Sequence, residues 1–268
     1  MYSPQIKSLY TYPLKSAGGI SLSETQVTSL GFELDREFAL VNSEGKVLTA
    51  REKPQLLQLN VAITKDFLSI SDNGKELQIP LKVSSGEVQE LQLFENPAFG
   101  KLINEEANLW FRNYLGEALR LVRIDKTNLR TVSSKYNLLG NQYISFADGF
   151  PIHLVSEASV ADLNTKLDNA MPAERFRPNI IISGIPAYSE ESWKTISIGT
   201  CIFDVIEKTP RCSLITIDPK TALINKRQEP LRTLATYKKE EKAVNFGVYL
   251  IPRNEGRLLK SDIISINQ

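Results

Sequence analysis

The sequence is poor in the side chains that most often hold metals or act as catalytic bases. Among its 268 residues there are one histidine, His153, and two cysteines, Cys201 and Cys212. Catalytic triads that need histidine and multi-histidine zinc or iron sites are therefore nearly excluded. Two cysteines do not make a disulfide framework. His153 alternates with apolar residues, so we expect it to have a structural role on a strand.

The chain also lacks a long apolar run and a large net charge of either sign. No stretch approaches the roughly 20 apolar residues of a membrane-spanning helix, and no basic segment followed by an apolar one opens the chain. We therefore expect a cytoplasmic protein without a membrane span. The formal net charge is +1, so nothing points to nucleic acid as a partner. An anionic ligand would have to be bound by local arginine and lysine side chains.

The spacing of turn signals predicts a mainly β protein with a few helices. Short runs rich in β-branched and aromatic residues alternate with turns about every 8–12 residues, which is typical of an antiparallel sheet or barrel. The polar stretch 127–143 is the best candidate for a domain junction or a mobile loop. We therefore divide the chain into a β-rich domain, residues 1–125, and a second domain, residues 126–268.

The periodicity also predicts individual elements. Helices are expected at residues 104–115, 156–167 and 230–237, each with apolar residues at helical spacing or a capping residue at its start. Strands are expected at residues 6–12, 20–28, 38–41, 47–51, 56–63, 67–70, 77–81, 88–94, 119–123, 152–155, 180–183, 193–198, 201–207, 214–217, 244–252 and 262–266.

One of the two cysteines follows an arginine. Cys212 comes directly after Pro210 and Arg211, on a predicted short loop between two strands. A neighbouring cation favours the thiolate form, and a thiolate is a nucleophile and a ligand for soft metals. Most free cysteines are instead small buried hydrophobic residues. The residues alone leave both interpretations open for Cys212, whereas we expect Cys201 to be a packing residue.

Several basic or polar residues lie on predicted loops next to strand ends. Arginine and lysine beside hydroxyl and amide groups suit a ligand that carries phosphate. Each of these residues could equally be a solvated surface group, and their spacing does not show that they converge. The residues are Lys15, Ser16, Arg36, Arg177, Asn179 and Arg211.

Taken in order, the motifs resemble those of the MOSC domain proteins, which are named after molybdenum cofactor sulfurase C-terminal domains. The resemblance is strongest to the branch that contains the mitochondrial amidoxime-reducing component and its bacterial relatives. It runs from about residue 6 to about residue 250. It implies two packed β-barrel-like domains, a MOSC N-terminal domain and a pyruvate-kinase-barrel-like MOSC domain. The matching segments include Tyr12-Pro-Leu-Lys15-Ser16, Leu48-Thr-Ala-Arg51, Phe176-Arg177-Pro-Asn179, Arg211-Cys212 and Thr216-Ile-Asp218-Pro219.

The resemblance implies a cofactor and a site. The family binds a molybdenum cofactor, which is molybdopterin with a phosphate tail, and a cysteine thiolate ligates the metal. Cys212 stands at that position and is the implied catalytic residue and molybdenum ligand. Arg112 and Asn113 replace a smaller hydroxyl pair, so we assign no cofactor contact to them. The implied cofactor-binding residues are Lys15, Ser16, Arg36, Asp148, Gly149, Phe150, Arg177, Asn179, Pro210, Arg211 and Tyr249.

The resemblance further implies an oxidoreductase that reduces small N-oxygenated compounds, such as amidoximes, hydroxylamines and N-hydroxylated bases. Two cysteines cannot supply the four thiolates of an iron–sulfur cluster. We therefore expect a separate electron donor, which would be a flavoprotein, a ferredoxin or a cytochrome b5-like protein. One alternative is a carrier of molybdenum cofactor or of sulfur, with Cys212 as a persulfide-bearing thiol and no turnover. A second is a protein that binds another phosphorylated ligand.

Overall fold

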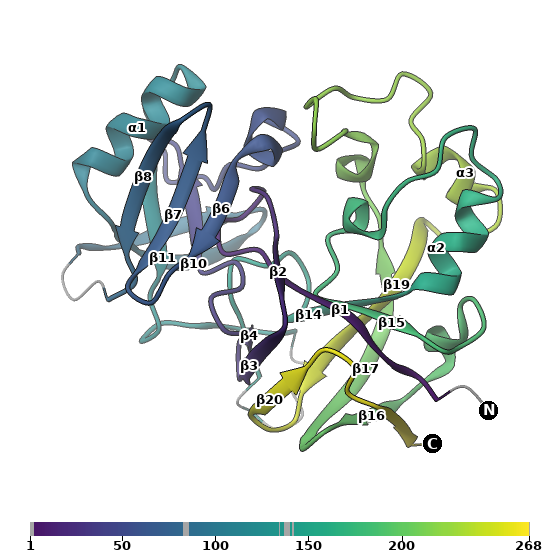
Figure 1. Cartoon of the computed structure of the whole chain (residues 1–268). Helices are drawn as coiled ribbons and strands as arrows, with labels where there is room; N and C mark the ends of the chain where they lie inside the picture. Colours follow the sequence, from purple (N-terminus) through teal and green to yellow (C-terminus); the bar gives the residue numbers. More distant parts are fainter. Residues whose placement is uncertain (1–2, 83–85, 134, 137–139, 141, 268) are drawn as a thin grey trace.

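The computed structural model describes residues 3–82, 86–133, 135–136, 140 and 142–267. Figure 1 shows two halves side by side, with the blue and teal N-terminal half on the left and the green and yellow C-terminal half on the right. The expected mainly β architecture is confirmed. The sheets of the described residues are open, and none of them closes into a barrel.

A nine-stranded sheet forms the C-terminal half and includes the first two strands of the chain. Its order is β2-β1-β15-β14-β19-β17-β16-β21, and β18 pairs with β19. Every pair is antiparallel except the central pair of β14 with β15. The strands are β1 (Gln5–Thr11), β2 (Ile20–Leu22), β14 (Ile152–Ser156), β15 (Ile180–Ser183), β16 (Thr195–Ile198), β17 (Cys201–Pro210), β18 (Lys239–Glu240), β19 (Ala243–Pro252) and β21 (Ile264–Asn267).

Smaller antiparallel sheets form the N-terminal half. One has the order β5-β11-β10-β9 and another β6-β7-β8. Asn73 and Gly74 have φ of 44° and 81°, which confirms the hairpin turn predicted there. The strands are β5 (Phe38–Val41), β6 (Asn60–Ile63), β7 (Phe67–Asp72), β8 (Lys75–Pro80), β9 (Val88–Leu93), β10 (Asn96–Leu102) and β11 (Arg120–Ile124).

Two short sheets complete the fold. The pair β12 (Arg130–Thr131) and β13 (Tyr143–Ile144) lies within and beside the stretch predicted to be a junction. The sheet β20-β3-β4 joins β20 (Gly256–Leu259), near the C-terminus, to β3 (Glu24–Thr28) and β4 (Gly31–Phe32). Strands from both predicted domains therefore pair with each other here and in the nine-stranded sheet. The boundary after residue 125 stays a prediction.

The described residues form three α-helices, and two of them begin at a capping side chain. In α1 (Glu105–Leu115), the Asn104 side chain accepts a hydrogen bond from Ala107 N at 2.8 Å, and Gly116 is left-handed. Ser156 caps α2 (Glu157–Asn164), which stops before the predicted residue 167. α3 spans Leu231–Ala235. Among the described residues, no helix combines the length and apolar character needed to cross a membrane.

The structure corrects two strand predictions in the first half. Residues 56–63 begin as the 3-10 helix η1 (Pro54–Gln58), because Pro54 suits a first helical turn, and only the last four residues are extended. Residues 47–51 form no strand: Val47 makes a single bridge to Val41. The turn before them is confirmed, since Gly45 N donates to Asn42 O at 3.1 Å.

The segment after Cys212 is also corrected. Residues 214–217 were expected to be a strand but form the 3-10 helix η4 (Ser213–Thr216). A four-residue apolar run cannot be distinguished from a buried helical turn by its periodicity. Cys212 therefore lies between a strand and a helical turn. Two further 3-10 helices, η2 (Ala173–Phe176) and η3 (Ser189–Ser192), connect the central strands.

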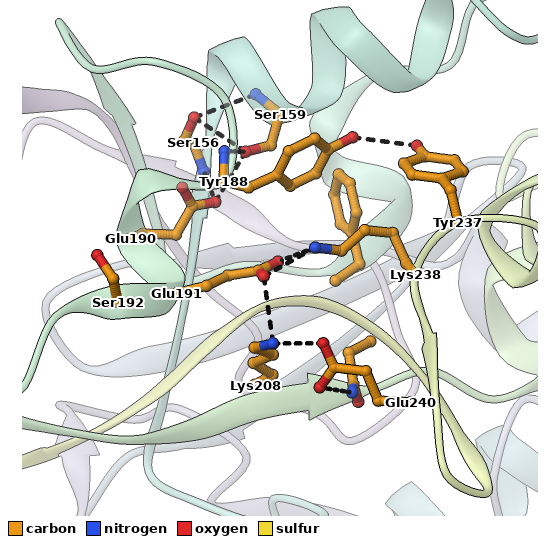
Figure 2. Close-up of polar contacts among 12 residues, drawn as sticks. Ser156, Ser159, Tyr188, Glu190, Glu191, Ser192, Lys208, Tyr237, Lys238 and Glu240 are labelled. Atoms are coloured by element: carbon orange, nitrogen blue, oxygen red, sulfur yellow. Dashed lines mark hydrogen bonds and ion pairs between the residues drawn. The ribbon is translucent and has the colours of Figure 1, made fainter.

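A buried polar cluster fastens η3 beneath α2, and Figure 2 shows it. The Glu190 side chain is fully buried, and its Oε1 accepts hydrogen bonds from Ser159 Oγ at 2.9 Å and from Ser156 N at 3.3 Å. Its Oε2 has no hydrogen-bond partner among the described residues. Burial raises the pKa of Glu190, and the hydrogen bonds only partly offset this effect.

Ion pairs extend this cluster to the neighbouring strands. Glu191 pairs with Lys238 at 2.6 Å and with Lys208 at 3.7 Å, and Lys208 also pairs with Glu240. Figure 2 shows these side chains pointing toward one another from η3, β17, β18 and the residue before β18, Lys238. Because Glu191 and Lys238 are each about nine-tenths buried, this pair holds η3 against the sheet.

The raised pKa of Glu190 predicts a pH-dependent stability. A carboxyl group whose pKa is raised by folding stabilises the folded state at pH values below its ordinary pKa, which is 4.5 for Glu190. This stabilisation is lost as the pH rises through the pKa that the group has in the folded protein. We expect Glu190→Gln to remove this loss, so the variant gains stability over the wild type as the pH rises from 4.5. Urea unfolding between pH 4 and pH 8 measures the difference. Parallel profiles would refute the prediction, and Glu255→Gln, at an exposed position, is the control.

Candidate functional site

One cavity collects most of the residues that the motifs singled out. Loops that follow β1 and β17 and loops that precede β5, β14 and β15 contribute its walls. All of the implied site residues except Gly149, Pro210 and Cys212 line it. They are Lys15, Ser16, Arg36, Asp148, Phe150, Arg177, Asn179, Arg211 and Tyr249. Residue spacing could not show this convergence, because the residues come from five separate loops and a strand.

A buried lysine stands at one wall of the cavity. The Lys15 side chain is 6% exposed, and its Nζ donates to Phe146 O at 2.7 Å and pairs with the exposed carboxylate of Asp148. Burial lowers the pKa of Lys15, and the charge of Asp148 opposes that shift. Neighbouring groups partly desolvate this carboxylate, which would raise the pKa of Asp148, but the charge and hydrogen bond of Lys15 hold the pKa below its ordinary value.

Two arginines share one aromatic ring. The Cζ atoms of Arg36 and Arg177 each lie 4.3 Å from the centroid of the Tyr12 ring. Arg36 Nη2 donates to Arg177 O at 3.1 Å, and Arg36 Nη1 contacts Asp35 at 2.5 Å. Burial lowers the pKa of Arg177 to about 10, and the charge of Arg36 acts in the same direction. The ring and the carbonyl groups hold two like charges together.

Two buried donors in the cavity walls have no acceptor. They are Arg177 Nη2 and Arg211 Nε, which find no hydrogen-bond partner among the described residues. A second nitrogen of each arginine has a partner: Arg177 Nη1 donates to Ala17 O at 2.7 Å and Arg211 Nη2 donates to Phe176 O at 2.9 Å. An unpaired buried donor is costly. An anionic ligand with phosphate oxygens would satisfy both donors and compensate the clustered positive charge.

The backbone of the site is strained at three positions. Ser16, Arg36 and Arg177 have φ of 72°, 51° and 55°, in the left-handed region that residues other than glycine seldom adopt. Such conformations cost on the order of 1–3 kcal/mol each and gather at ligand-binding sites. Ser16 Oγ accepts a hydrogen bond from Ala50 N at 2.9 Å, which holds that turn in place.

Asn179 and His153 are joined to each other by hydrogen bonds in the cavity wall. Asn179 Oδ1 accepts from His153 N at 3.1 Å, and Asn179 Nδ2 donates to Tyr10 O at 3.2 Å. The Asn179 side chain therefore fastens β14 and β1 to the loop that precedes β15. His153 lines the cavity as well, and burial and Arg211 lower its pKa well below the ordinary value. Its ring is neutral at physiological pH.

Cys212 lies beside the cavity. It is exposed, follows Arg211 directly, and precedes Leu214, which lines the cavity. Burial lowers the pKa of Arg211, and the neighbouring Tyr249 hydroxyl and Cys212 thiol oppose that shift, so the thiol lies close to Arg211. Cys201 is fully buried in the core of the large sheet, where it was expected. The described residues contain no cluster of three or more His, Cys, Asp or Glu side chains suited to a metal.

Gly149 and Pro210 are the two implied cofactor-binding residues that do not line the cavity. A Cβ atom at Gly149 would lie 3.2 Å from the Tyr249 ring, so the glycine lets that ring approach the loop. Pro210 is exposed at the end of β17, opposite Asn245. Neither residue lines the cavity, and the cofactor contacts implied for them stay predictions.

The motifs missed several residues of the site. Ala147, Phe176 and Leu214 line the cavity, as does His153, for which only a structural role was expected. Phe176 stands inside the Arg-Phe-Arg-Pro-Asn segment, so its position was a usable signal. For Phe94 the sequence held no such signal. Its ring lies 5.4 Å from Lys15 Nζ and 5.1 Å from Arg51 Cζ, although these residues are far from Phe94 in the sequence.

The geometry defines a cavity lined by cationic side chains beside an exposed thiol, and the comparisons give the family of the chain. Residues 3–118 match the MOSC N-terminal beta barrel domain and residues 141–266 match the MOSC domain. The chain belongs to the MOSC family and carries both of its domains. The resemblance inferred from the motifs is therefore confirmed.

The relatives carry two kinds of name. The chain is 34% identical to mitochondrial amidoxime reducing component 2 of Rattus norvegicus, over 96% of this chain and 81% of that protein. It is 31% identical to mitochondrial amidoxime-reducing component 1 of Homo sapiens, with the same coverage of both chains. It is 30% identical to molybdenum cofactor sulfurase of Oryza sativa subsp. japonica, over 91% of this chain but 32% of that protein.

The hydrogen bonds of the Asn179 side chain predict a measurable contribution to the free energy of unfolding. Asn179→Ala leaves His153 N and Tyr10 O without their partner inside the fold, and each unsatisfied group is costly. We expect the free energy of unfolding to fall by about 1–3 kcal/mol, measured by urea denaturation. Asn60→Ala, at an exposed position at the start of β6, is the matched control and should change little. Equal effects of the two substitutions would contradict the prediction.

Proposed function

We propose that the protein is a molybdenum-cofactor-dependent oxidoreductase that reduces small N-oxygenated compounds. The observation that carries the proposal is the convergence of four cationic side chains on one cavity beside Cys212. Two of these side chains carry a buried donor that has no partner among the described residues. The names of the relatives add the substrate class, since two of those reported are amidoxime reducing components. The overall reaction is R–NH–OH + 2 e⁻ + 2 H⁺ → R–NH₂ + H₂O.

The residues present fit the cofactor. Its phosphate and dithiolene groups are anionic, and Lys15, Arg36, Arg177 and Arg211 would compensate them in a cavity where charges are poorly screened. Cys212 is the residue that would hold the metal through its thiolate, a ligand that soft metals accept. When bound, the molybdenum cofactor supplies the two-electron chemistry that removes oxygen from a substrate.

The remaining side chains would order the substrate and its protons. Burial raises the pKa of Tyr249 to about 12, so its hydroxyl is protonated at neutral pH and can donate a hydrogen bond into the cavity. His153 is neutral and buried, so it adds no further positive charge. A separate protein, either a flavoprotein, a ferredoxin or a cytochrome b5-like protein, would deliver the electrons one at a time.

Replacing the thiol tests the metal ligand. We expect Cys212→Ser to lose both the bound molybdenum and amidoxime reduction, because a serine hydroxyl is not deprotonated where a thiol is. Protein from a cofactor-producing host is assayed for metal content and for turnover with reduced methyl viologen. Cys201→Ala, which removes the buried thiol instead, is the control and should keep activity. A Cys212→Ser variant with full activity and metal would overturn the assignment.

Removing one unpaired donor tests the anion site. We expect Arg177→Gln to weaken retention of the cofactor about tenfold or more, the effect of losing a charge-assisted hydrogen bond. Extractable pterin is measured per mole of protein after gel filtration, which needs no activity. Arg253→Gln, which removes an exposed arginine paired with Asp204, is the matched control. Unchanged pterin content in Arg177→Gln would count against the site.

A carrier of cofactor or sulfur is the second candidate function, and the exposure of Cys212 favours it. One relative is a molybdenum cofactor sulfurase. In that case Cys212 would bear a persulfide and the protein would not turn over substrate. Cyanide-labile sulfur on Cys212 without viologen-driven reduction would support the carrier. A visible absorption band that bleaches on addition of an amidoxime would support the enzyme.

A further inference from the structure

The two most exposed large apolar side chains of the described residues are adjacent. Leu223 is 69% exposed and Ile224 is 59% exposed. Both belong to the loop of residues 217–228, which Figure 1 shows at the top of the view between η4 and α3. Single exposed apolar residues need no explanation, but a pair held out together marks a surface that another molecule covers.

Hydrogen bonds hold this loop in one shape. Asp218 N donates to Leu223 O and Asn225 N donates to Thr216 O, both at 2.8 Å, and Ile217 bridges Ile224. These contacts join the backbone of residues 223–225 to the backbone of residues 216–218. The two side chains are therefore presented to solvent by an ordered backbone, so little entropy is lost when a partner binds.

The loop begins next to the candidate metal ligand. It leaves from η4, which follows Cys212 directly and carries Leu214 in the cavity wall. Gln58 Nε2 donates to Lys220 O at 2.9 Å, so the N-terminal half supports the loop as well. Ile217 N in turn donates to Leu214 O at 3.1 Å, so backbone contacts connect the apolar pair to the cavity wall.

The charge around the apolar pair is positive. Lys220, Lys226 and Arg227 are exposed on the same loop. Two acidic groups near the loop are already paired within the protein: Asp218 with Arg175, and Asp168 with Arg227 at 3.0 Å. Lys220 and Lys226, which form no ion pair among the described residues, therefore carry the free positive charge of the rim. An apolar centre with a charged rim is the usual anatomy of a protein interface, and a basic rim selects an acidic partner.

We propose that the 217–228 loop is the docking surface for the electron-donor protein, and that this donor presents an acidic patch around its redox centre. The proposal rests on the proposed function. Each encounter passes one electron, so two encounters supply the two electrons that one N-hydroxyl group consumes together with two protons. Leu223 and Ile224 form the centre of the contact, and Lys220 and Lys226 steer the donor to it.

Kinetics with two kinds of reductant test the proposal on the cofactor-loaded protein. The probes are three acidic donors, a plant-type ferredoxin, a flavodoxin and a cytochrome b5 haem domain, each kept reduced by its own reductase. Reduced methyl viologen, a small molecule, needs no docking surface. We expect the double variant Leu223→Ser, Ile224→Ser to raise the KM for the protein donor about tenfold, as the loss of central interface residues does, with viologen-driven turnover unchanged.

A control variant and a charge-reversal variant complete the test. Leu109→Ser removes a 54% exposed leucine from α1 and should leave the KM for the donor unchanged. Lys226→Glu should raise this KM at low salt and reduce its dependence on ionic strength. A double variant with the wild-type KM for the donor would overturn the proposal.

Two other outcomes also overturn it. One is a wild type that turns over with reduced methyl viologen but with none of the three acidic protein donors. The other is a wild-type dimer that the double variant dissociates in sedimentation, because a second copy of the chain would then cover the loop. Failure of the proposed function can be distinguished from failure of the docking proposal, because in the former case the wild type would show no viologen-driven reduction.

Discussion

The gathering of positive charge around one cavity is the constraint on which the rest of the site depends. Arg36 and Arg177 stack on the single ring of Tyr12, and Lys15 is buried against Asp148. Such an arrangement is unfavourable without compensation, because burial and like charges both lower the pKa of the cations. The fold supplies part of the compensation through carbonyl oxygens and two carboxylates. An anionic ligand would supply the remainder.

The same constraint explains where the fold is strained. Three residues that line the cavity adopt left-handed backbone conformations, and each brings a polar side chain to the same space from a different loop. Rigid strands fix the ends of these loops, so the strain does not relax. The nine-stranded sheet, which takes strands from both ends of the chain, is therefore a scaffold for loops that carry the site.

Much of the fold could be predicted from the sequence where local chemistry is decisive. The caps Asn104 and Ser156 fixed the starts of two helices, and Asn73-Gly74 fixed a hairpin. Predictions failed where a short apolar run carries no distinguishing period, as at residues 56–58 and 214–216. Strand β10 went unpredicted, because its Pro97 and Gly100 are residues that usually interrupt strands.

The sequence by itself determined which chemical groups were available: one thiol on a predicted loop, a few loop cations and a set of motifs that identified the MOSC family. Only the tertiary structure decided that these groups meet. It placed nine implied residues around one cavity, left Gly149 and Pro210 out of its lining, and engaged the Asn179 side chain with the backbone. It also exposed Leu223 and Ile224 beside the Cys212 segment. Convergence depends on long-range strand pairing, which no local pattern encodes.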